Sequence, residues 1–244
     1  MNGKVIMIAS GKGGTGKSTA AVYIGAQLAA MGRQVLLVEL DAGLRSVDII
    51  SGVYGRTVYD VEDILSGRCI PEKAVVESPL YPGLQVISAP YSGGDVSAAP
   101  LVKLVEALSK HLDYILLDTA AGMGAPFVAA AAVSQLALLV LTPDPVALRD
   151  GRIVADWLYT HSKAVPRLVI NRVDPARQYR SAVPDLDECI DTVAAQLIAV
   201  IPESSELQHA ASTSTPLPRS STAWQAFHNL ACRLEGQSVP LLLR

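Results

Sequence analysis

The sequence predicts a three-layer α/β fold, in which a mostly parallel sheet is covered by helices on both faces. Short apolar runs alternate with helical patterns along the chain, which is typical of strand–helix–strand units. The run Leu136–Leu141 is apolar throughout, as expected for a central parallel strand that is buried on both faces. Half of the 244 residues are hydrophobic, enough for a sizeable core.

Strands are expected at the apolar runs, and helices in most of the gaps between them. The strand runs are Val5–Ala9, Val35–Leu40, Leu84–Ala89, Tyr114–Leu117, Leu136–Leu141, Leu168–Ile170 and Leu197–Ile201. The helical patterns are Lys17–Met31, Val47–Gly52, Ser97–Ser109, Ala125–Val133, Pro145–His161, Leu186–Ala195, Ser205–Ala211 and Thr222–Leu234. No repeat, charge block or low-complexity linker divides the sequence, so we expect a single domain over residues 1–244.

Composition argues against several classes of protein. The net charge of −3 gives no strong attraction to nucleic acid or anionic lipid. Cys69, Cys189 and Cys232 lie far apart without a C-x-x-C pair, which fits a reducing cytosol rather than a disulfide framework. Ala125–Pro143 is about long enough to span a bilayer, but Ser134 and Gln135 divide it into a helix and a strand. We therefore expect a cytoplasmic protein without a transmembrane segment.

A phosphate-binding loop is predicted directly after the first strand. Gly11, Gly16, Lys17 and Ser18 satisfy the spacing G-x-x-x-x-G-K-[ST], with a strand before and a helix after. Glycines let several N–H groups converge on a phosphate chain, and the helix adds its positive N-terminal end. Lys17 would reach the β- and γ-phosphates, and the Ser18 hydroxyl would bind Mg²⁺. The predicted nucleoside triphosphate site comprises Gly11, Lys12, Gly13, Gly14, Thr15, Gly16, Lys17, Ser18 and Thr19.

The loop has a second lysine, Lys12, at a position that the general motif leaves open. The string GKGGTGKST resembles the deviant Walker A motif of the MinD/ParA superfamily of ATPases, which share the P-loop NTPase fold. The resemblance runs from about Lys4 to Leu241. It implies that ATP and Mg²⁺ are the ligands, that the chain forms an ATP-dependent homodimer, and that Lys12 crosses the dimer interface to the partner's nucleotide.

Two aspartates follow strands. The string ELDAGLRSVD over Glu39–Asp48 resembles the D-x-G-L-R-x-x-D pattern of the MinD branch, which implies that Asp41 holds the attacking water and helps to organise the Mg²⁺ shell. An isolated Asp there could simply cap the next helix. Asp118 ends an apolar strand in the manner of Walker B and would bind Mg²⁺ through a water, opposite Ser18. The branch has D-x-P-A-G here, so Ala120 removes a φ restraint from this switch-like loop.

Further strand ends carry the base-binding and partner-binding candidates. Asn171-Arg172 matches the superfamily's base-recognition position, where an amide can present a donor and an acceptor to adenine. Pro202-Glu203 resembles the loop that closes over the base. Thr142–Asp150 resembles T-x-P-E-x-x-x-x-R-D with Asp144 in place of Glu, which implies a dimer or partner surface at Arg149 and Asp150. An ordinary exposed helix N-terminus is the alternative.

The end of the sequence bears on membrane association. Ala223–Leu234 is amphipathic, but Arg233 is its only full cation, so we interpret it as the last core helix. The residues after Gly236 are too few for the basic amphipathic tail of the MinD branch. Membrane association by that route is therefore unsupported, and peripheral association at the inner face of the membrane is left open.

The resemblance implies a slow, dimerising switch ATPase that works with unidentified protein regulators and controls spatial positioning, such as septum-site selection. Alternatives in the same superfamily are plasmid or chromosome partition and flagellar-number control, although Arg172, Arg177 and Arg180 give only a modest nucleic-acid signal. A metallochaperone would need cysteines close after Asp118, where none occurs. A non-catalytic nucleotide-binding scaffold is the last alternative.

Overall fold

The computed structural model describes residues 3–43, 45–91, 98–174 and 184–242. Its centre is an 8-stranded sheet in the order β3-β4-β2-β5-β1-β6-β7-β8. β3 is antiparallel to β4, and the other pairs are parallel. The strands are β1 (Lys4–Ala9), β2 (Val35–Glu39), β3 (Val76–Glu77), β4 (Leu84–Ile87), β5 (Tyr114–Asp118), β6 (Leu136–Leu141), β7 (Val165–Val173) and β8 (Gln196–Pro202). The predicted mostly parallel sheet is confirmed.

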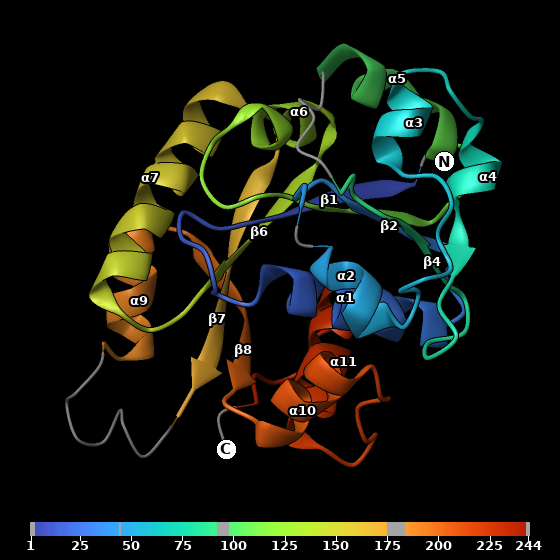
Figure 1. Cartoon of the computed structure of the whole chain (residues 1–244). Helices are drawn as coiled ribbons and strands as arrows, with labels where there is room; N and C mark the ends of the chain where they lie inside the picture. Colours follow the sequence, from blue (N-terminus) through green and yellow to red (C-terminus); the bar gives the residue numbers. More distant parts are fainter. Residues whose placement is uncertain (1–2, 44, 92–97, 175–183, 243–244) are drawn as a thin grey trace.

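Helices cover both faces of this sheet (Figure 1). Both faces of the sheet are apolar, because alternate residues of each strand point to opposite faces. In β1, Ile6 and Ile8 enter one apolar core, while Val5, Met7 and Ala9 enter the other. The helices are α1 (Lys17–Ala30), α2 (Ser46–Ser51), α3 (Val61–Leu65), α4 (Pro71–Ala74), α5 (Ala98–Leu108), α6 (Ala125–Val133), α7 (Pro145–His161), α9 (Leu186–Val193), α10 (Ser205–Thr213) and α11 (Thr222–Leu234).

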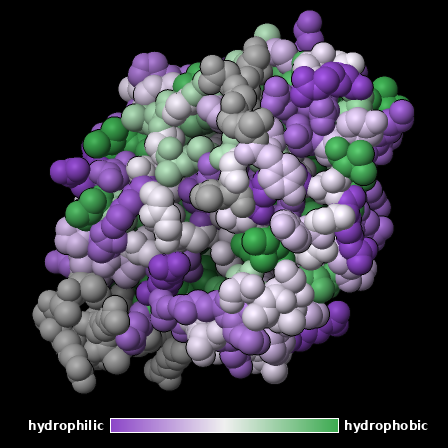
Figure 2. All heavy atoms as spheres, in the orientation of Figure 1, coloured by the Kyte–Doolittle hydropathy of each residue, from purple (hydrophilic) through white to green (hydrophobic). Residues whose placement is uncertain are grey.

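The two cores use different helices. The first lies under α1, α2, α10 and α11, and the second lies under α3, α5, α6, α7 and α9. In α11, Ala223, Phe227 and Leu230 are at most 1% exposed, so the interpretation of this segment as a core helix is confirmed. The face shown in Figure 2 carries apolar side chains in scattered groups between polar and charged ones. Among the described residues, no helix has the length and apolar character needed to cross a membrane.

Several predicted boundaries differ from the structure. β7 extends from Val165 to Val173, well beyond the apolar run 168–170. The residues before this run pair with β6, and Val173 pairs with Pro202 of β8 past an irregularity in the register. The short elements β3, α3 and α4 were not predicted. α3 had a usable signal, since Asp60 and Asp63 form a capping box at its start. Ser97, Arg177 and Arg180 lie outside the described residues.

Candidate nucleotide-binding site

The predicted phosphate loop connects β1 to α1 at the carboxyl end of the sheet. Gly14 and Gly16 have φ values of 77° and 95°, which a residue with a side chain adopts only with strain. No side chain caps α1, which starts at Lys17 after Gly16. The first N–H groups of this helix therefore have no side-chain acceptor, which suits them to an anion such as phosphate.

Two glycines of the loop are also required by packing. A Cβ at Gly11 would lie 2.6 Å from the Cβ and carbonyl oxygen of Asp150, so α7 packs directly on the loop. A Cβ at Gly16 would lie 2.3 Å from Nδ2 of Asn171 in β7. The loop is thus held between α7 and β7. Asp150, which we predicted at a partner surface, contacts the phosphate loop of its own chain.

Lys12 and Arg149 lie at the surface beside this loop. The side chain of Lys12 is 45% exposed, and its Nζ is 3.6 Å from Oδ1 of Asp144. Asp144 is fixed as the N-cap of α7, where it accepts a hydrogen bond from the Ala147 N–H. Arg149 is 75% exposed and pairs with Asp150 at 3.3 Å. Neither cation lines the cavity described below, so both remain candidates for contact with a second molecule.

Asp118 is the centre of the predicted magnesium site. It ends β5 and is fully buried, and neither of its carboxylate oxygens has a hydrogen-bond partner among the described residues. Burial raises its pKa to about 7; the Ser18 hydroxyl and the Lys17 ammonium oppose this increase, and the Asp41 carboxylate adds to it. The predicted residues Ser18, Lys17 and Asp41 are thus near enough to Asp118 to influence its pKa. An unpartnered buried carboxylate beside a hydroxyl is a donor set that fits Mg²⁺.

The loop after Asp118 is ordered despite the missing proline. The N–H and the hydroxyl of Thr119 both donate to the carbonyl oxygen of Ile8, at 3.2 and 3.0 Å. Gly122 has a φ of 84°, and its N–H donates to the carbonyl oxygen of Ser10 at 3.0 Å. These bonds hold the loop around Ala120 against the end of β1 and the start of the phosphate loop.

A second buried carboxyl group, Glu39, had no predicted role. It ends β2 opposite Asp118 in the strand register, is 1% exposed, and accepts a hydrogen bond from the Val47 N–H at 3.2 Å. Burial, Asp118 and Asp48 raise the pKa of Glu39 to about 8, partly offset by backbone N–H donors. A glutamate at the last position of a buried strand, two residues before Asp41, was the available sequence signal.

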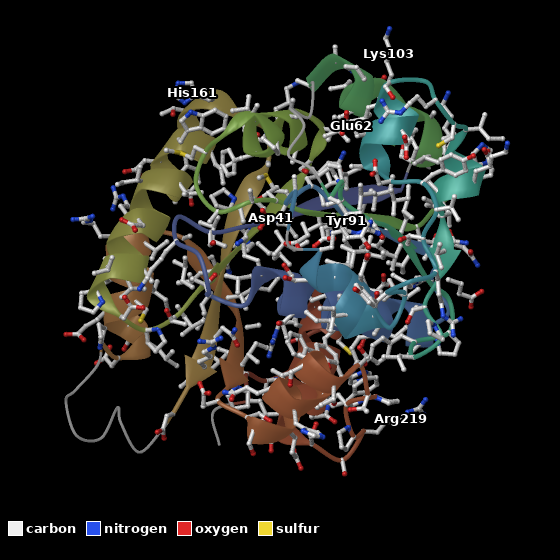
Figure 3. All side chains as sticks on the ribbon, in the orientation of Figure 1. Asp41, Glu62, Tyr91, Lys103, His161 and Arg219 are labelled. Atoms are coloured by element: carbon white, nitrogen blue, oxygen red, sulfur yellow. The ribbon has the colours of Figure 1, made fainter. Side chains whose placement is uncertain are left out.

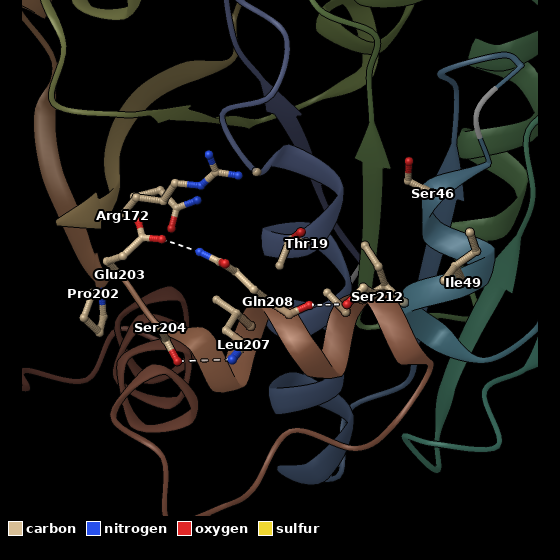
Figure 4. A pocket seen from close by; sticks show the side chains of 14 residues that line it. Thr19, Ser46, Ile49, Arg172, Pro202, Glu203, Ser204, Leu207, Gln208 and Ser212 are labelled. Carbon is tan, nitrogen blue, oxygen red and sulfur yellow. Dashed lines mark hydrogen bonds between the residues drawn. The ribbon is translucent and has the colours of Figure 1, made fainter. Parts of the chain in front are cut away.

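A cavity of about 450 Å³ opens beside the phosphate loop (Figure 4). The predicted residues Gly16, Thr19, Asn171, Arg172, Pro202 and Glu203 line it. Its other walls come from α2, α10 and the residue before α10, which sequence reasoning missed: Ser46, Ile49, Ile50, Ser204, Leu207, Gln208, Ala211 and Ser212. The Gln208 amide donates to Glu203 across the rim.

The structure corrects the predicted chemistry of Asn171. Its Nδ2 already donates to the carbonyl oxygen of Thr15 at 2.8 Å, while its Oδ1 is buried without a partner. With this donor committed to Thr15, only the buried acceptor Oδ1 of Asn171 is left without a partner, rather than the free donor and acceptor that we expected. A buried acceptor favours a base with an exocyclic amine, such as adenine, over one with a carbonyl at that place.

The fold and this site define a P-loop nucleotide-binding protein. A phosphate loop at a helix N-terminus, a carboxylate at a neighbouring strand end and a base-sized cavity lie at one edge of a parallel sheet. The chain belongs to the CobQ/CobB/MinD/ParA family of nucleotide-binding domains, whose family model matches residues 6–217, and is a member of the MinD/ParA ATPases.

Similarity to proteins of this family extends over nearly the whole chain. Septum site-determining protein MinD of Synechocystis sp. is 34% identical, covering 98% of this chain and 92% of its own length. A chain of the MinC:MinD cell division protein complex of Aquifex aeolicus is 35% identical with a TM-score of 0.91, covering 99% of both chains. MinD of Pyrococcus horikoshii, determined with Mg-ADP, is 25% identical with a TM-score of 0.85, covering 95% of this chain and 96% of its own.

Proposed function

We propose that this chain is a switch ATPase that dimerises when ATP is bound and takes part in selecting the septum site during cell division. The observation that carries the ATPase proposal is the buried, unpartnered carboxylate of Asp118, with Ser18, Lys17 and Asp41 around it. The near full-length similarity to septum site-determining MinD proteins supports the cellular role.

Each residue of the proposed site has a separate role in ATP binding or hydrolysis. The loop N–H groups and Lys17 bind the β- and γ-phosphates, and the cavity walls with Asn171 hold the adenine. Ser18 and Asp118 would hold Mg²⁺, which would neutralise phosphate charge. Asp41 orients a water in line with the γ-phosphorus; the new P–O bond forms as the bond to the ADP oxygen breaks, releasing phosphate. Positioning and charge neutralisation are the main requirements of phosphoryl transfer.

Asp41→Ala tests the hydrolytic assignment. We expect the variant to bind ATP with unchanged affinity in calorimetry while losing turnover in a phosphate-release assay, because the lost carboxylate orients the attacking water and helps to organise the Mg²⁺ shell but does not bind the phosphates or the base. Turnover equal to that of the wild type would contradict the role of Asp41.

Lys12 is the residue that we propose reaches the second copy. In gel filtration with ATP and Mg²⁺, the wild type should elute as a dimer and Lys12→Ala as a monomer. Lys163→Ala, at another exposed lysine, is the matched control and should dimerise. Dimerisation of Lys12→Ala to the same extent as the control would remove the proposed contact.

The partner and the process require separate tests. One similar structure is a MinC:MinD complex, so we propose a MinC-type protein as a partner of this chain. Binding in calorimetry should require ATP and should be lost in Lys12→Ala. In the native cell, depletion of the protein should misplace division septa in fluorescence images. Normally placed septa would restrict the proposal to another positioning process.

A further inference from the structure

A buried arginine anchors the segment that follows Asp41. Arg45 is 4% exposed, and its guanidinium contacts Asp48, with Nε to Oδ2 at 2.7 Å, and also donates to the hydroxyl of Thr57. Its backbone is left-handed, with φ 47° and ψ 43°, a conformation that costs energy for a residue with a side chain. The surrounding contacts must therefore impose this conformation.

Those contacts come largely from the segment that follows β4. The Ser88 hydroxyl donates to Oδ1 of Asp48, and the Pro90 carbonyl oxygen accepts the Gly43 N–H at 3.0 Å. The ring of Tyr91 covers the guanidinium of Arg45, with 3.9 Å between the guanidinium carbon and the ring centroid. Residues 88–91 thus contact the segment after Asp41 at Gly43, Arg45 and Asp48. These three contacts lie before, at and after the left-handed residue.

Tyr91 differs from the rest of this network because it lies at the surface. Tyr91 is 62% exposed, whereas Arg45 is 4% exposed and both Asp48 and Ser88 are fully buried. Figure 3 labels Tyr91 and Asp41 next to each other in the middle of the view. The ring therefore shields a buried ion pair from water, and attraction between ion-pair partners and between a cation and a ring strengthens when water is excluded.

We propose that Tyr91 is a positioning residue for ATP hydrolysis, because it holds Arg45 and, through Arg45, the segment that carries Asp41. This inference rests on the proposed ATPase function. Tyr91 does not line the nucleotide cavity, so loss of its ring should affect the placement of Asp41 without weakening nucleotide binding.

Tyr54 provides a matched control. It is 65% exposed, close to the 62% of Tyr91, and it follows α2 in the same region, but no ring contact with an arginine involves it among the described residues. Tyr91→Ala should lower kcat roughly three- to tenfold, with the dissociation constant of ATP unchanged. Tyr91→Phe, which keeps the ring, and Tyr54→Ala should both retain the wild-type kcat.

Trypsin gives a readout that does not depend on turnover. The peptide bond after Arg45 should be cut faster in nucleotide-free Tyr91→Ala than in Tyr54→Ala, because the side chain that trypsin must bind has lost its cover. In an Arg45→Gly background, which relieves the left-handed strain, adding Tyr91→Ala should lower kcat no further.

The possible failures are distinguishable. If Tyr91→Ala matches Tyr54→Ala in both kcat and cleavage, or if its loss of activity reflects weaker ATP binding, the role of Tyr91 is wrong while the ATPase proposal stands. If the wild type binds ATP without hydrolysing it, the ATPase proposal fails. Cleavage after Arg45 then still decides whether Tyr91 holds the segment.

Discussion

The side-chain amide of Asn171 donates a hydrogen bond to the carbonyl oxygen of Thr15 at 2.8 Å and so ties β7 to the phosphate loop. The contact is close enough that Gly16 could not carry a Cβ. The residue that we propose binds the base therefore also fixes the proposed phosphate loop. We expect binding at the two ends of a nucleotide to be coupled through this side chain.

Asn171→Ala should weaken ATP binding about tenfold, because it removes the acceptor for the base and leaves the Thr15 carbonyl unpartnered. It should also reduce the preference for ATP over GTP, since Oδ1 is the group that rejects a carbonyl. Calorimetry with both nucleotides measures this, with Asn229→Ala in α11 as the control. A wild type that binds GTP as tightly as ATP would refute the acceptor-only assignment.

Gly11→Ala should lower the free energy of unfolding of the nucleotide-free protein by about 1–3 kcal/mol, because the new Cβ overlaps Asp150 and forces the loop away from α7. Gly13→Ala is the control, since a Cβ there meets nothing within 4 Å. Urea denaturation of both variants compares them directly. Equal stability would show that the loop and α7 move apart at no cost.

Magnesium affinity should depend on pH through Asp118. Its pKa of about 7 means that protons compete with Mg²⁺ below neutrality. The apparent affinity, measured by titration in the presence of ADP, should fall by about tenfold per pH unit well below pH 7 and level off above it. Asp118→Asn should lack the high-affinity site at every pH. An affinity that is the same at pH 6 and pH 8 would contradict the proposed ligand.

Glu39 should make the protein less stable as pH rises. Its pKa is about 8 in the fold and about 4 when unfolded, so the native state retains a proton that the unfolded state loses. This stabilisation is complete below pH 4 and is lost as pH rises through 8. Glu39→Gln, which resembles the protonated form, should gain about 2 kcal/mol or more relative to wild type between pH 5 and pH 8.

Urea titrations in nucleotide-free buffer with EDTA measure this difference. Titration of Asp118 makes the free energy of unfolding depend on pH in both proteins. The comparison therefore concerns the difference between their slopes of unfolding free energy against pH. Glu106→Gln, at an exposed position of α5, should follow the wild type. Parallel curves for Glu39→Gln and wild type would show that Glu39 is ionised in the fold.

Local sequence patterns predicted the parts of the structure that depend on residues close together in the chain. α6, β6, α7 and α11 have the predicted bounds, because each is a long apolar or amphipathic run with a clear stop. The phosphate loop was predicted for the same reason, because its glycines and Lys17 lie close together in the sequence. β7 was predicted too short because its first residues, 165–167, form no apolar run and are strand only through pairing with β6.

By itself, the sequence predicted the sheet-and-helix alternation, the phosphate loop and the placement of Asp41, Asp118 and Asn171 near the carboxyl ends of strands, although Asn171 lies within β7 rather than after it. The tertiary structure decided which atoms of those residues remain free. The Asn171 donor is committed to Thr15, Glu39 is buried opposite Asp118, and the α10 wall of the cavity comes from residues that carry no motif. Hydrogen-bond pairing and burial depend on residues that are distant in the chain, and only packing brings them together.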